Sequence, residues 1–270
     1  MGKTSVVEGW PGLPSFVVLL RSGNDVTRVN EAGDLDTVRP WASVSKMAVA
    51  LAAAKMVDRG DANYGDPMGP LGASLAHLLS HSAGLGFEVG DPVSPVGVKR
   101  LYSNYGIDIA VQALAGDHSA EAWLNREVLG PLSMSSTHLV GRASAGLQGS
   151  TNDLAALARG WLTGDQLSAA TRDVATSVFL PDLAGIVPGF GRFSPCPWSL
   201  GPEVRGDKQH WMGDWPSDSV GHFGQSGALM LLNIREGIGL VATSTESFGS
   251  WAVQIWPTWT SSLRSRALSL

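Results

Sequence analysis

The 270-residue sequence contains a single cysteine, Cys196. One cysteine excludes an internal disulfide and any cysteine-rich metal site. Because no histidine or acidic residue neighbours Cys196 in the sequence, we interpret it as a packing residue rather than a nucleophile. Any chemistry must therefore rest on other residues.

The sequence also lacks long apolar runs. No stretch approaches the roughly 18 apolar residues that cross a membrane. Residues 1–11 contain no apolar core of an export signal. We therefore expect no membrane span, and a cytoplasmic location unless an export signal has been removed.

Charge of one sign is not concentrated in any block of the chain. The formal net charge is −5, which argues against a nucleic-acid-binding surface. Hydrophobic residues make up 44% and charged residues 16%, a composition that excludes a disordered chain. A chain of this length can bury a large core, as one large domain or as two closely packed lobes.

Strand-like runs lie near both ends of the chain. Residues 16–21 and 26–30 flank a turn and predict a β-hairpin, and residues 228–235 and 238–243 predict a second one. Residues 198–201 predict one further strand. Strands at both ends with helices between them indicate that the two ends share one antiparallel sheet.

Helical segments fill the middle of the chain. Capping residues and helix formers predict helices over residues 73–82, 104–115, 120–129 and 154–162. A closing helix is expected over residues 251–263, where Pro257 is predicted to kink or split it.

Residues 43–60 are expected to form a buried helix that carries a catalytic pair. The run from residue 47 to residue 54 is apolar on every face, which indicates burial on all sides. Ser43 and Lys46 are three residues apart and project from one face of the first turn. Burial lowers the pKa of a lysine, so Lys46 can accept the proton of Ser43 and activate it. A serine that caps a helix, followed by a surface lysine, gives the same pattern. The pair alone therefore does not establish a catalytic site.

Tyr102 and Asn104 lie at a predicted junction between a loop and a helix. A nearby lysine ammonium would lower the pKa of the Tyr102 phenol, which could then relay the serine proton to a leaving group. The Asn104 amide could hold both the lysine and a substrate amide. The alternative is a helix cap with a packed tyrosine.

Residues 222–227 (His-Phe-Gly-Gln-Ser-Gly) precede the second hairpin. Gly224 would allow a substrate backbone to approach a strand edge, and His222 would donate a hydrogen bond to the substrate or leaving group. The Gln225 amide would serve as an oxyanion donor opposite the Ser43 amide. Alone, a histidine with glycines before a strand indicates only a turn.

Other patterns point to weaker alternatives. His77 and His81 have the spacing of two metal ligands on a helix, but no third ligand is evident, so we interpret them as capping or packing residues. Residues 224–228 miss the Gly-x-Ser-x-Gly elbow of α/β-hydrolases by one position. We interpret Trp211 and Trp215 as packing residues that could still line an apolar acyl pocket.

Together, the three motifs resemble those of the serine β-lactamase and penicillin-binding protein superfamily, in order and in context. Three intervening segments add to the resemblance: residues 78–85 (Leu-Leu-Ser-His-Ser-Ala-Gly-Leu), 130–137 (Gly-Pro-Leu-Ser-Met-Ser-Ser-Thr) and 150–155 (Ser-Thr-Asn-Asp-Leu-Ala). The resemblance spans about residues 38–245 and is greatest to the class C β-lactamase-like branch. That branch includes carboxylesterases, D-aminopeptidases and D,D-carboxypeptidases.

The resemblance implies an α+β fold of the β-lactamase type. An antiparallel sheet flanked by helices would adjoin an all-helical lobe, with the active site between them. We expect a single domain over residues 1–270. Its α/β lobe would comprise about residues 1–60 and 205–270, and its helical lobe about residues 61–204.

The resemblance also assigns roles within the site. It implies that Ser43 is the acylated nucleophile, that Lys46 and Tyr102 handle protons, and that Asn104 is a positioning group. The amides of Ser43 and Gln225 would form the oxyanion hole.

Two departures from the family pattern affect the expected substrate. His222 stands where penicillin-hydrolysing members carry lysine, so the cationic anchor for a β-lactam carboxylate should be weaker or pH-dependent. The chain is also shorter than is usual for this branch.

The predicted function is a serine hydrolase that works through a Ser43 acyl-enzyme without a metal or organic cofactor. Its substrate would be a small-molecule ester, amide, D-amino-acid peptide or β-lactam. His222 and the missing export signal favour an esterase or peptidase over a resistance enzyme. The alternative is an inactive family member that binds a ligand or partner through the same cleft.

Overall fold

The computed structural model describes residues 8–89 and 93–270 of the chain. Its main feature is a six-stranded antiparallel sheet with the strand order β2-β1-β11-β10-β9-β8. The strands are β1 (Ser15–Ser22), β2 (Asp25–Ala32), β8 (Glu203–Val204), β9 (Val220–Phe223), β10 (Leu229–Asn233) and β11 (Ile238–Thr243). Because β1 pairs with β11 from Ser15 opposite Thr243 to Leu20 opposite Ile238, the two ends of the chain share one sheet, as predicted.

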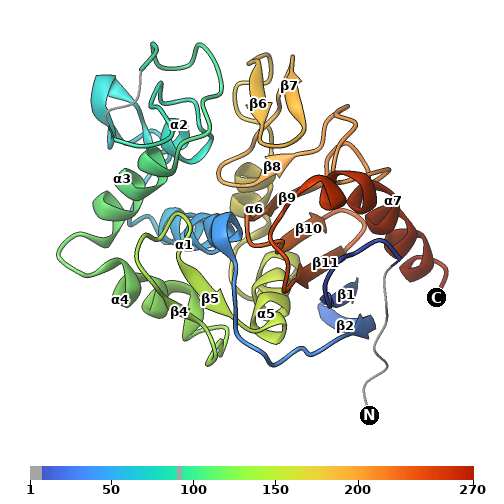
Figure 1. The fold of residues 1–270 in the computed structure, drawn as a ribbon. Coiled ribbons are helices and arrows are strands. Elements are labelled where there is room, and N and C mark those ends of the chain that lie inside the picture. The colour runs from blue at the N-terminus through green and yellow to red at the C-terminus, as the bar shows by residue number, and fades with distance from the viewer. Residues whose placement is uncertain (1–7, 90–92) are drawn as a thin grey trace.

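The remaining chain forms helices, short turns and strands, and the loops that connect them (Figure 1). The α-helices are α1 (Ser45–Arg59), α2 (Leu75–Leu79), α3 (Asn104–Ala115), α4 (Ala120–Leu124), α5 (Thr151–Leu162), α6 (Ala169–Thr176) and α7 (Ser250–Ala267). Short turns of other helical types are η1 (Ala42–Val44), η2 (Pro70–Gly72) and η3 (Asn125–Leu129). Short strands are β3 (Arg39–Pro40), β4 (His138–Leu139), β5 (Leu147–Gly149), β6 (Gly185–Val187) and β7 (Gly191–Phe193).

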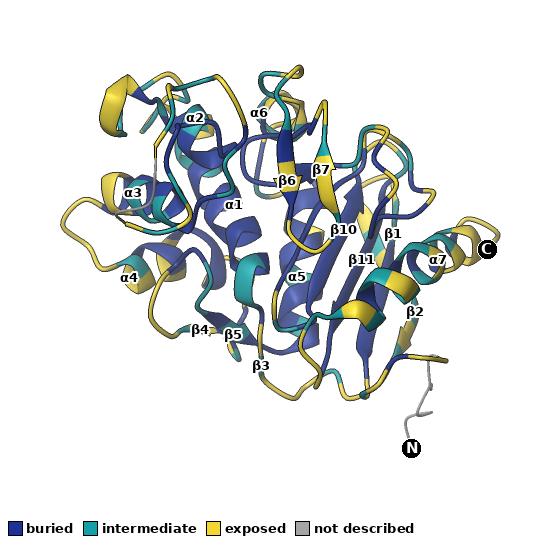
Figure 2. Ribbon diagram, turned by 45° about the horizontal axis from the view of Figure 1, so that its top comes forward, coloured by how far each residue is buried: buried dark blue, intermediate teal, exposed yellow. Residues whose placement is uncertain are grey.

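Helix α1 lies at the centre of the molecule, between the helices α3 and α4 and the sheet (Figure 1). Its residues from Ser45 to Ala54 are all buried, as the apolar run predicts (Figure 2). Gly60 ends the helix with a φ of 80°, a left-handed conformation that glycine adopts without steric cost. Because η1 precedes α1 directly, the buried helix fixes the position of Ser43.

The sheet separates two apolar cores because successive side chains of a strand point to opposite faces. On β1, Val17 and Leu19 pack into the core that contains α1 and α5. Phe16 and Val18 pack into the other core, which contains Trp256 and other residues of α7. The sheet is therefore covered on both faces. Strands β9, β10 and β11 are buried along their length, whereas the edge strand β2 is exposed or half-buried (Figure 2).

Several predicted elements differ from the observed ones. Residues 198–201 do not form a strand: Trp198 makes only an isolated bridge with Glu203, and Gly201 has a φ of 128°. Pro257 does not split α7, because burial of Trp256 and Leu263 holds the helix across it. The helix predicted over residues 73–82 is shorter, and the one over 120–129 changes to the wider η3 turn. Helix α6 and strands β6 and β7 were not predicted.

The cellular location of the protein and the division of its fold into two lobes stay predictions. Within the described residues, no helix is both long enough and apolar enough to cross a membrane. Residues 1–7, which bear on the predicted absence of an export signal, lie outside the described part. The division into lobes at about residues 60 and 205 stays a prediction.

Candidate active site

Ser43 and Lys46 meet at the start of α1. Ser43 lies in η1, one turn before the lysine, and Lys46 Nζ donates a hydrogen bond to Ser43 Oγ at 3.2 Å. The turn packs closely against the end of β9: a Cβ on Gly224 would come within 2.3 Å of the Trp41 carbonyl oxygen. Glycine at this position is therefore required by contact with the chain itself, in addition to any contact with substrate.

The Lys46 side chain is buried, with 1% of its surface exposed. Its Nζ donates to Asn104 Oδ1 at 2.7 Å and to the Ser144 carbonyl oxygen at 2.9 Å. Burial lowers the pKa of Lys46 to about 7, although the charge of Asp108 acts in the opposite direction. Near neutral pH a substantial fraction of Lys46 is thus unprotonated and can accept a proton from Ser43.

Tyr102 lies on the other side of Ser43 and forms a hydrogen bond with it. Lys46 Nζ lies 4.8 Å from the centre of the Tyr102 ring. The prediction of a lowered phenol pKa is wrong. Burial raises the pKa of Tyr102 above its ordinary value, and the hydrogen bond with Ser43 offsets this only in part. Tyr102 is therefore a protonated donor, and the neutral amine of Lys46 is the stronger candidate for the base.

His222 is buried on β9 and faces Tyr102, with Nε2 3.4 Å from the phenol oxygen. Burial and the nearby charge of Lys46 lower the pKa of His222 to about 3, so the ring is neutral at physiological pH. The Nδ1 atom lies 2.8 Å from the Phe223 carbonyl oxygen, which assigns the ring proton to Nδ1. Nε2 is then an acceptor, so the neutral ring does not provide the donor that the sequence suggested.

The rings of His81 and Trp198 pack beside Tyr102. The ring of His81 lies 4.5 Å from Tyr102, and the ring of Trp198 lies 5.0 Å from His81. His81 Nδ1 accepts a hydrogen bond from the Ser103 amide at 3.1 Å, while His77 takes part in the capping box of α2. The two histidines thus serve as packing and capping residues. Within the described residues, no cluster of three or more potential metal ligands occurs.

The turn after β9 carries the predicted oxyanion donor. Gly224 donates to the Ala228 carbonyl and Gly227 donates to the Gly224 carbonyl, so residues 224–228 form a tight turn. Gln225 is exposed in this turn, and its carbonyl accepts from the Phe248 amide. The role of the Gln225 amide in an oxyanion hole stays a prediction.

A cavity of about 460 Å³ adjoins Tyr102. Its lining is largely apolar and comprises Gly86, Phe87, Val93, Lys99, Arg100, Leu101, Tyr102, Ile186 and Pro188. Trp211 and Trp215 do not line it, because they are fully buried in the core beneath α7. The suggestion that these two tryptophans line an acyl pocket is therefore wrong.

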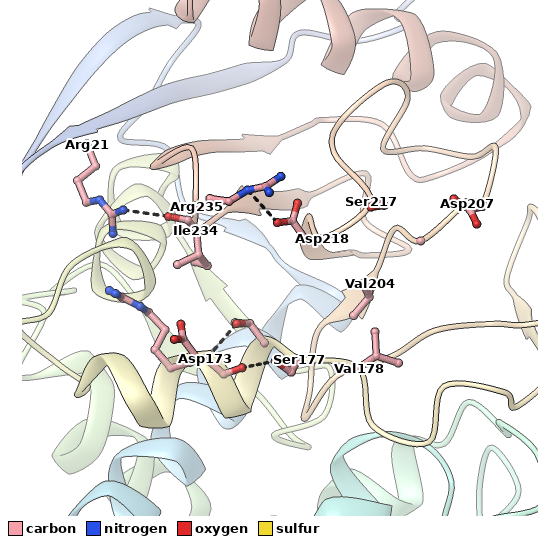
Figure 3. A pocket seen from close by; sticks show the side chains of 13 residues that line it. Arg21, Asp173, Ser177, Val178, Val204, Asp207, Ser217, Asp218, Ile234 and Arg235 are labelled. Carbon is pink, nitrogen blue, oxygen red and sulfur yellow. Dashed lines mark hydrogen bonds and ion pairs between the residues drawn. The ribbon is translucent and has the colours of Figure 1, made fainter.

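A second cavity, of about 890 Å³, contains none of the predicted site residues (Figure 3). Its arginines have structural partners. Arg21 and Arg172 both donate to the Leu162 carbonyl, at 2.7 and 3.1 Å, and Leu162 ends α5. Guanidinium groups at the negative end of a helix satisfy its free carbonyls. Arg235 pairs with Asp218. We therefore assign no site to this cavity.

The fold and the serine–lysine pair at the start of a buried helix define the class of serine hydrolases with a β-lactamase-like fold. The sequence profile of the Beta-lactamase family matches residues 11–257. The chain belongs to the Beta-lactamase family. No curated protein sequence gives a significant match.

Solved structures agree with this assignment. A β-lactamase from Mycobacterium bovis is 33% identical, with a TM-score of 0.88, and the alignment covers 96% of each chain. A β-lactamase/D-alanine carboxypeptidase from Yersinia pestis in complex with citrate is 18% identical, with a TM-score of 0.73 and coverage of 95% and 92%. The octameric penicillin-binding protein homologue from Pyrococcus abyssi is 18% identical, with a TM-score of 0.69 and coverage of 96% and 73%. The last two show the fold alone.

The lowered pKa of Lys46 predicts the pH dependence of the reaction. If the neutral amine is the base, kcat/KM for a neutral ester rises with pH through a midpoint near 7 and then levels off, because protonated Lys46 cannot accept the serine proton. His222, with a pKa of about 3, adds no step between about pH 5 and pH 9. The measurement is a pH profile of p-nitrophenyl butyrate hydrolysis.

The exposed residue His138 provides a control for this profile. His138→Gln should leave the midpoint in place, because His138 lies on β4 and contacts none of the site residues. A flat profile across the same range would contradict the assignment of Lys46 as the base.

Proposed function

We propose that the protein is a serine hydrolase that forms an acyl-enzyme at Ser43 and acts on neutral esters with an apolar acyl group. The observation that carries the proposal is the buried Lys46 amine, 3.2 Å from Ser43 Oγ and with a pKa of about 7. A serine hydroxyl is a weak nucleophile until a base removes its proton, and the amine is placed to do so.

The acylation step follows from these positions. Neutral Lys46 takes the proton of Ser43 as Oγ attacks the ester carbonyl carbon. The resulting oxyanion would accept hydrogen bonds from the Ser43 and Gln225 amides. Tyr102, which the raised pKa keeps protonated, donates its proton to the departing alkoxide and then recovers one from the Lys46 ammonium. Asn104 keeps the lysine in place between these transfers.

Deacylation reverses the same transfers with water in place of the alcohol. Tyr102 passes its proton to neutral Lys46 and takes one from the attacking water. The Lys46 ammonium then protonates Ser43 Oγ as the acyl group leaves as a carboxylic acid. The enzyme returns to its starting state, and no cofactor enters the balance.

The charge around His222 supports a neutral substrate. β-Lactams and D,D-peptides carry a carboxylate near the scissile bond, and penicillin-hydrolysing relatives place a lysine at this position. His222 is neutral here because its pKa is about 3. A carboxylate at this strand edge would therefore have no fixed positive partner on β9 and would be poorly bound.

The cavity beside Tyr102 supports an apolar acyl group. Phe87 and Ile186 line it, with 49% and 62% of their surfaces exposed. Large apolar side chains left exposed at a concave site favour an apolar ligand. Tyr102 lines this cavity and also forms a hydrogen bond with Ser43, and on the basis of this shared residue we place the acyl group of the substrate in the cavity.

A β-lactamase is the second candidate, because the relative from Mycobacterium bovis, which is 33% identical, is described as one. The alternative of an inactive binding protein is not favoured. The four side chains that acylation requires are present in this protein and are connected by hydrogen bonds: Ser43, Lys46, Tyr102 and Asn104.

Replacing the nucleophile distinguishes these candidates. Wild-type protein should hydrolyse p-nitrophenyl butyrate much faster than nitrocefin, and Ser43→Ala should lower ester hydrolysis by about 10³-fold or more. Ser135→Ala, at an exposed serine, is the control and should have no effect. Faster turnover of nitrocefin, also lost in Ser43→Ala, would establish the β-lactamase instead. Full activity of Ser43→Ala would refute the mechanism.

The cavity predicts a dependence on acyl chain length. The kcat/KM of p-nitrophenyl esters should rise from acetate to hexanoate, because each buried methylene contributes about 0.8 kcal/mol. Ile186→Ser should flatten this rise and leave acetate hydrolysis nearly unchanged. Val174→Ser removes an apolar side chain that is 53% exposed on α6 and should have no effect. An unchanged chain-length series in Ile186→Ser would show that the acyl group binds elsewhere.

A further inference from the structure

Two protein oxygens other than that of Ser43 accept hydrogen bonds from the amine of Lys46, and each belongs to a residue whose nitrogen donates to a carboxylate. The first oxygen belongs to Asn104. We call Asn104 and Glu88 together the asparagine arm. Asn104 Oδ1 accepts from Lys46 Nζ at 2.7 Å, and Asn104 Nδ2 donates to Glu88 Oε1 at 3.3 Å. The amide is therefore fixed in both position and orientation, since its oxygen faces the lysine and its nitrogen faces the acid.

The second oxygen belongs to Ser144. We call Ser144 and Asp108 together the serine arm. The Ser144 carbonyl accepts from Lys46 Nζ at 2.9 Å, and the Ser144 amide donates to Asp108 Oδ1 at 3.1 Å. Asp108 and Asn104 are four residues apart on α3 and so project from the same face of this helix. One helix thus contributes a member to each arm.

Arg142 joins the two arms. Its guanidinium makes an ion pair with Glu88 Oε2 and donates through Nε to Asp108 Oδ2 at 2.5 Å. A continuous ring of contacts therefore runs from Lys46 through the asparagine arm to Arg142, and back through the serine arm. We call it the Arg142 ring. It connects helix α1 with three other segments: the chain before α3, helix α3 itself, and the loop between β4 and β5.

We propose that Arg142 is a positioning residue that fixes the amine of Lys46 by holding the asparagine arm and the serine arm at the same time. The inference rests on the proposed function, because it concerns the rate at which Ser43 is acylated. A planar guanidinium can engage two carboxylates in fixed directions, whereas an ammonium is a point charge without that geometry. Arginine is therefore the side chain suited to this place.

The exposure of the ring separates its effect on the reaction from its effect on folding. The Arg142 side chain is 46% exposed, and those of Glu88 and Asp108 are 40% and 25% exposed. Ion pairs this accessible to water contribute little to the free energy of unfolding. The amine that they position is buried, however, and a displacement of about 1 Å at a reacting group can slow a reaction by about 100-fold.

The charges of the Arg142 ring act on the pKa of Lys46. Removing one of them should therefore shift the pH profile, which the loss of packing contacts alone would not do. The carboxylates of Asp108 and Glu88 raise the pKa of Lys46, and the guanidinium of Arg142 lowers it. Neutralising Glu88 should therefore move the acidic limb of the pH profile to lower pH. Removing the guanidinium should move it to higher pH.

The test compares acylation rates of the wild type with Arg142→Met, Arg142→Lys and Glu88→Gln. The two readouts are kcat and KM for p-nitrophenyl butyrate and the rate at which a fluorophosphonate labels Ser43. Arg142→Met should lower kcat and the labelling rate by about 10- to 100-fold, with little change in KM. Arg142→Lys should also react slowly, because an ammonium lacks the planar geometry that engages both carboxylates. It should keep the acidic limb near its wild-type position, because it retains the positive charge.

Arg59 offers a matched control elsewhere in the protein. Its side chain is 45% exposed and also pairs with two carboxylates, those of Asp61 and Glu127, at 2.9 and 2.8 Å. Because the Glu127 carboxylate is buried, with 4% of its side chain exposed, Arg59→Met should lower the melting temperature at least as much as Arg142→Met, and it should leave kcat within about twofold. If Arg142→Met fails to fold, Glu88→Gln decides: a slower reaction with the limb at lower pH supports the ring.

The outcomes separate this inference from the proposed function. If the wild type is acylated and Arg142→Met reacts at the same rate, the ring inference is overturned and the proposed function stands. The same holds if Arg59→Met slows the reaction as much as Arg142→Met. If the wild type neither hydrolyses the ester nor accepts the fluorophosphonate, the proposed function fails, and the ring inference fails with it.

Discussion

The burial of one amine, that of Lys46, is the constraint on which the rest of the site depends. Transfer of a charged ammonium into a protein interior costs free energy, so a buried lysine loses its proton more readily or requires compensating partners. The structure supplies neutral oxygens from Asn104 and Ser144 as its direct partners and keeps the acids one step away. The result is a pKa of about 7, close to the pH at which a base is most useful.

The fold creates this environment by placing α1 between two layers. Residues Ser45 to Ala54 of the helix are buried, and the Lys46 amine in its first turn is directed to Ser43 and to the oxygens of Asn104 and Ser144. Strand β9 brings His222 to the other side, and the same burial lowers the pKa of His222 and raises that of Tyr102. Burial thus favours the neutral form of all three groups. In the proposed mechanism the lysine therefore acts as the base and the tyrosine as the acid, and the histidine carries no charge that would attract an anionic substrate.

Much of the fold and the positions of the motif residues could be predicted from the sequence. The apolar run after Ser43 predicts the buried helix, and short strand-like runs at both ends predict the shared sheet. The electrostatic environment could not be predicted in the same way. The sequence suggested that the ammonium of Lys46 lowers the phenol pKa of Tyr102, but the degree of burial, which only the packed structure shows, reverses that shift. Ser144 and Arg142 belong to a loop with no motif, and they contact the site only because β4 and β5 return the chain to α3.

The most direct test of the account is to trap the acyl-enzyme and locate the acyl group. Wild-type protein would be mixed with p-nitrophenyl butyrate at a pH above the pKa of Lys46, quenched in acid and analysed by mass spectrometry of the intact chain and of its peptides. We expect one butyryl group, bound to Ser43, and none in protein mixed at a pH well below 7, where Lys46 is protonated. Turnover of the ester with the acyl group on another residue, or an equal adduct at both pH values, would contradict the account.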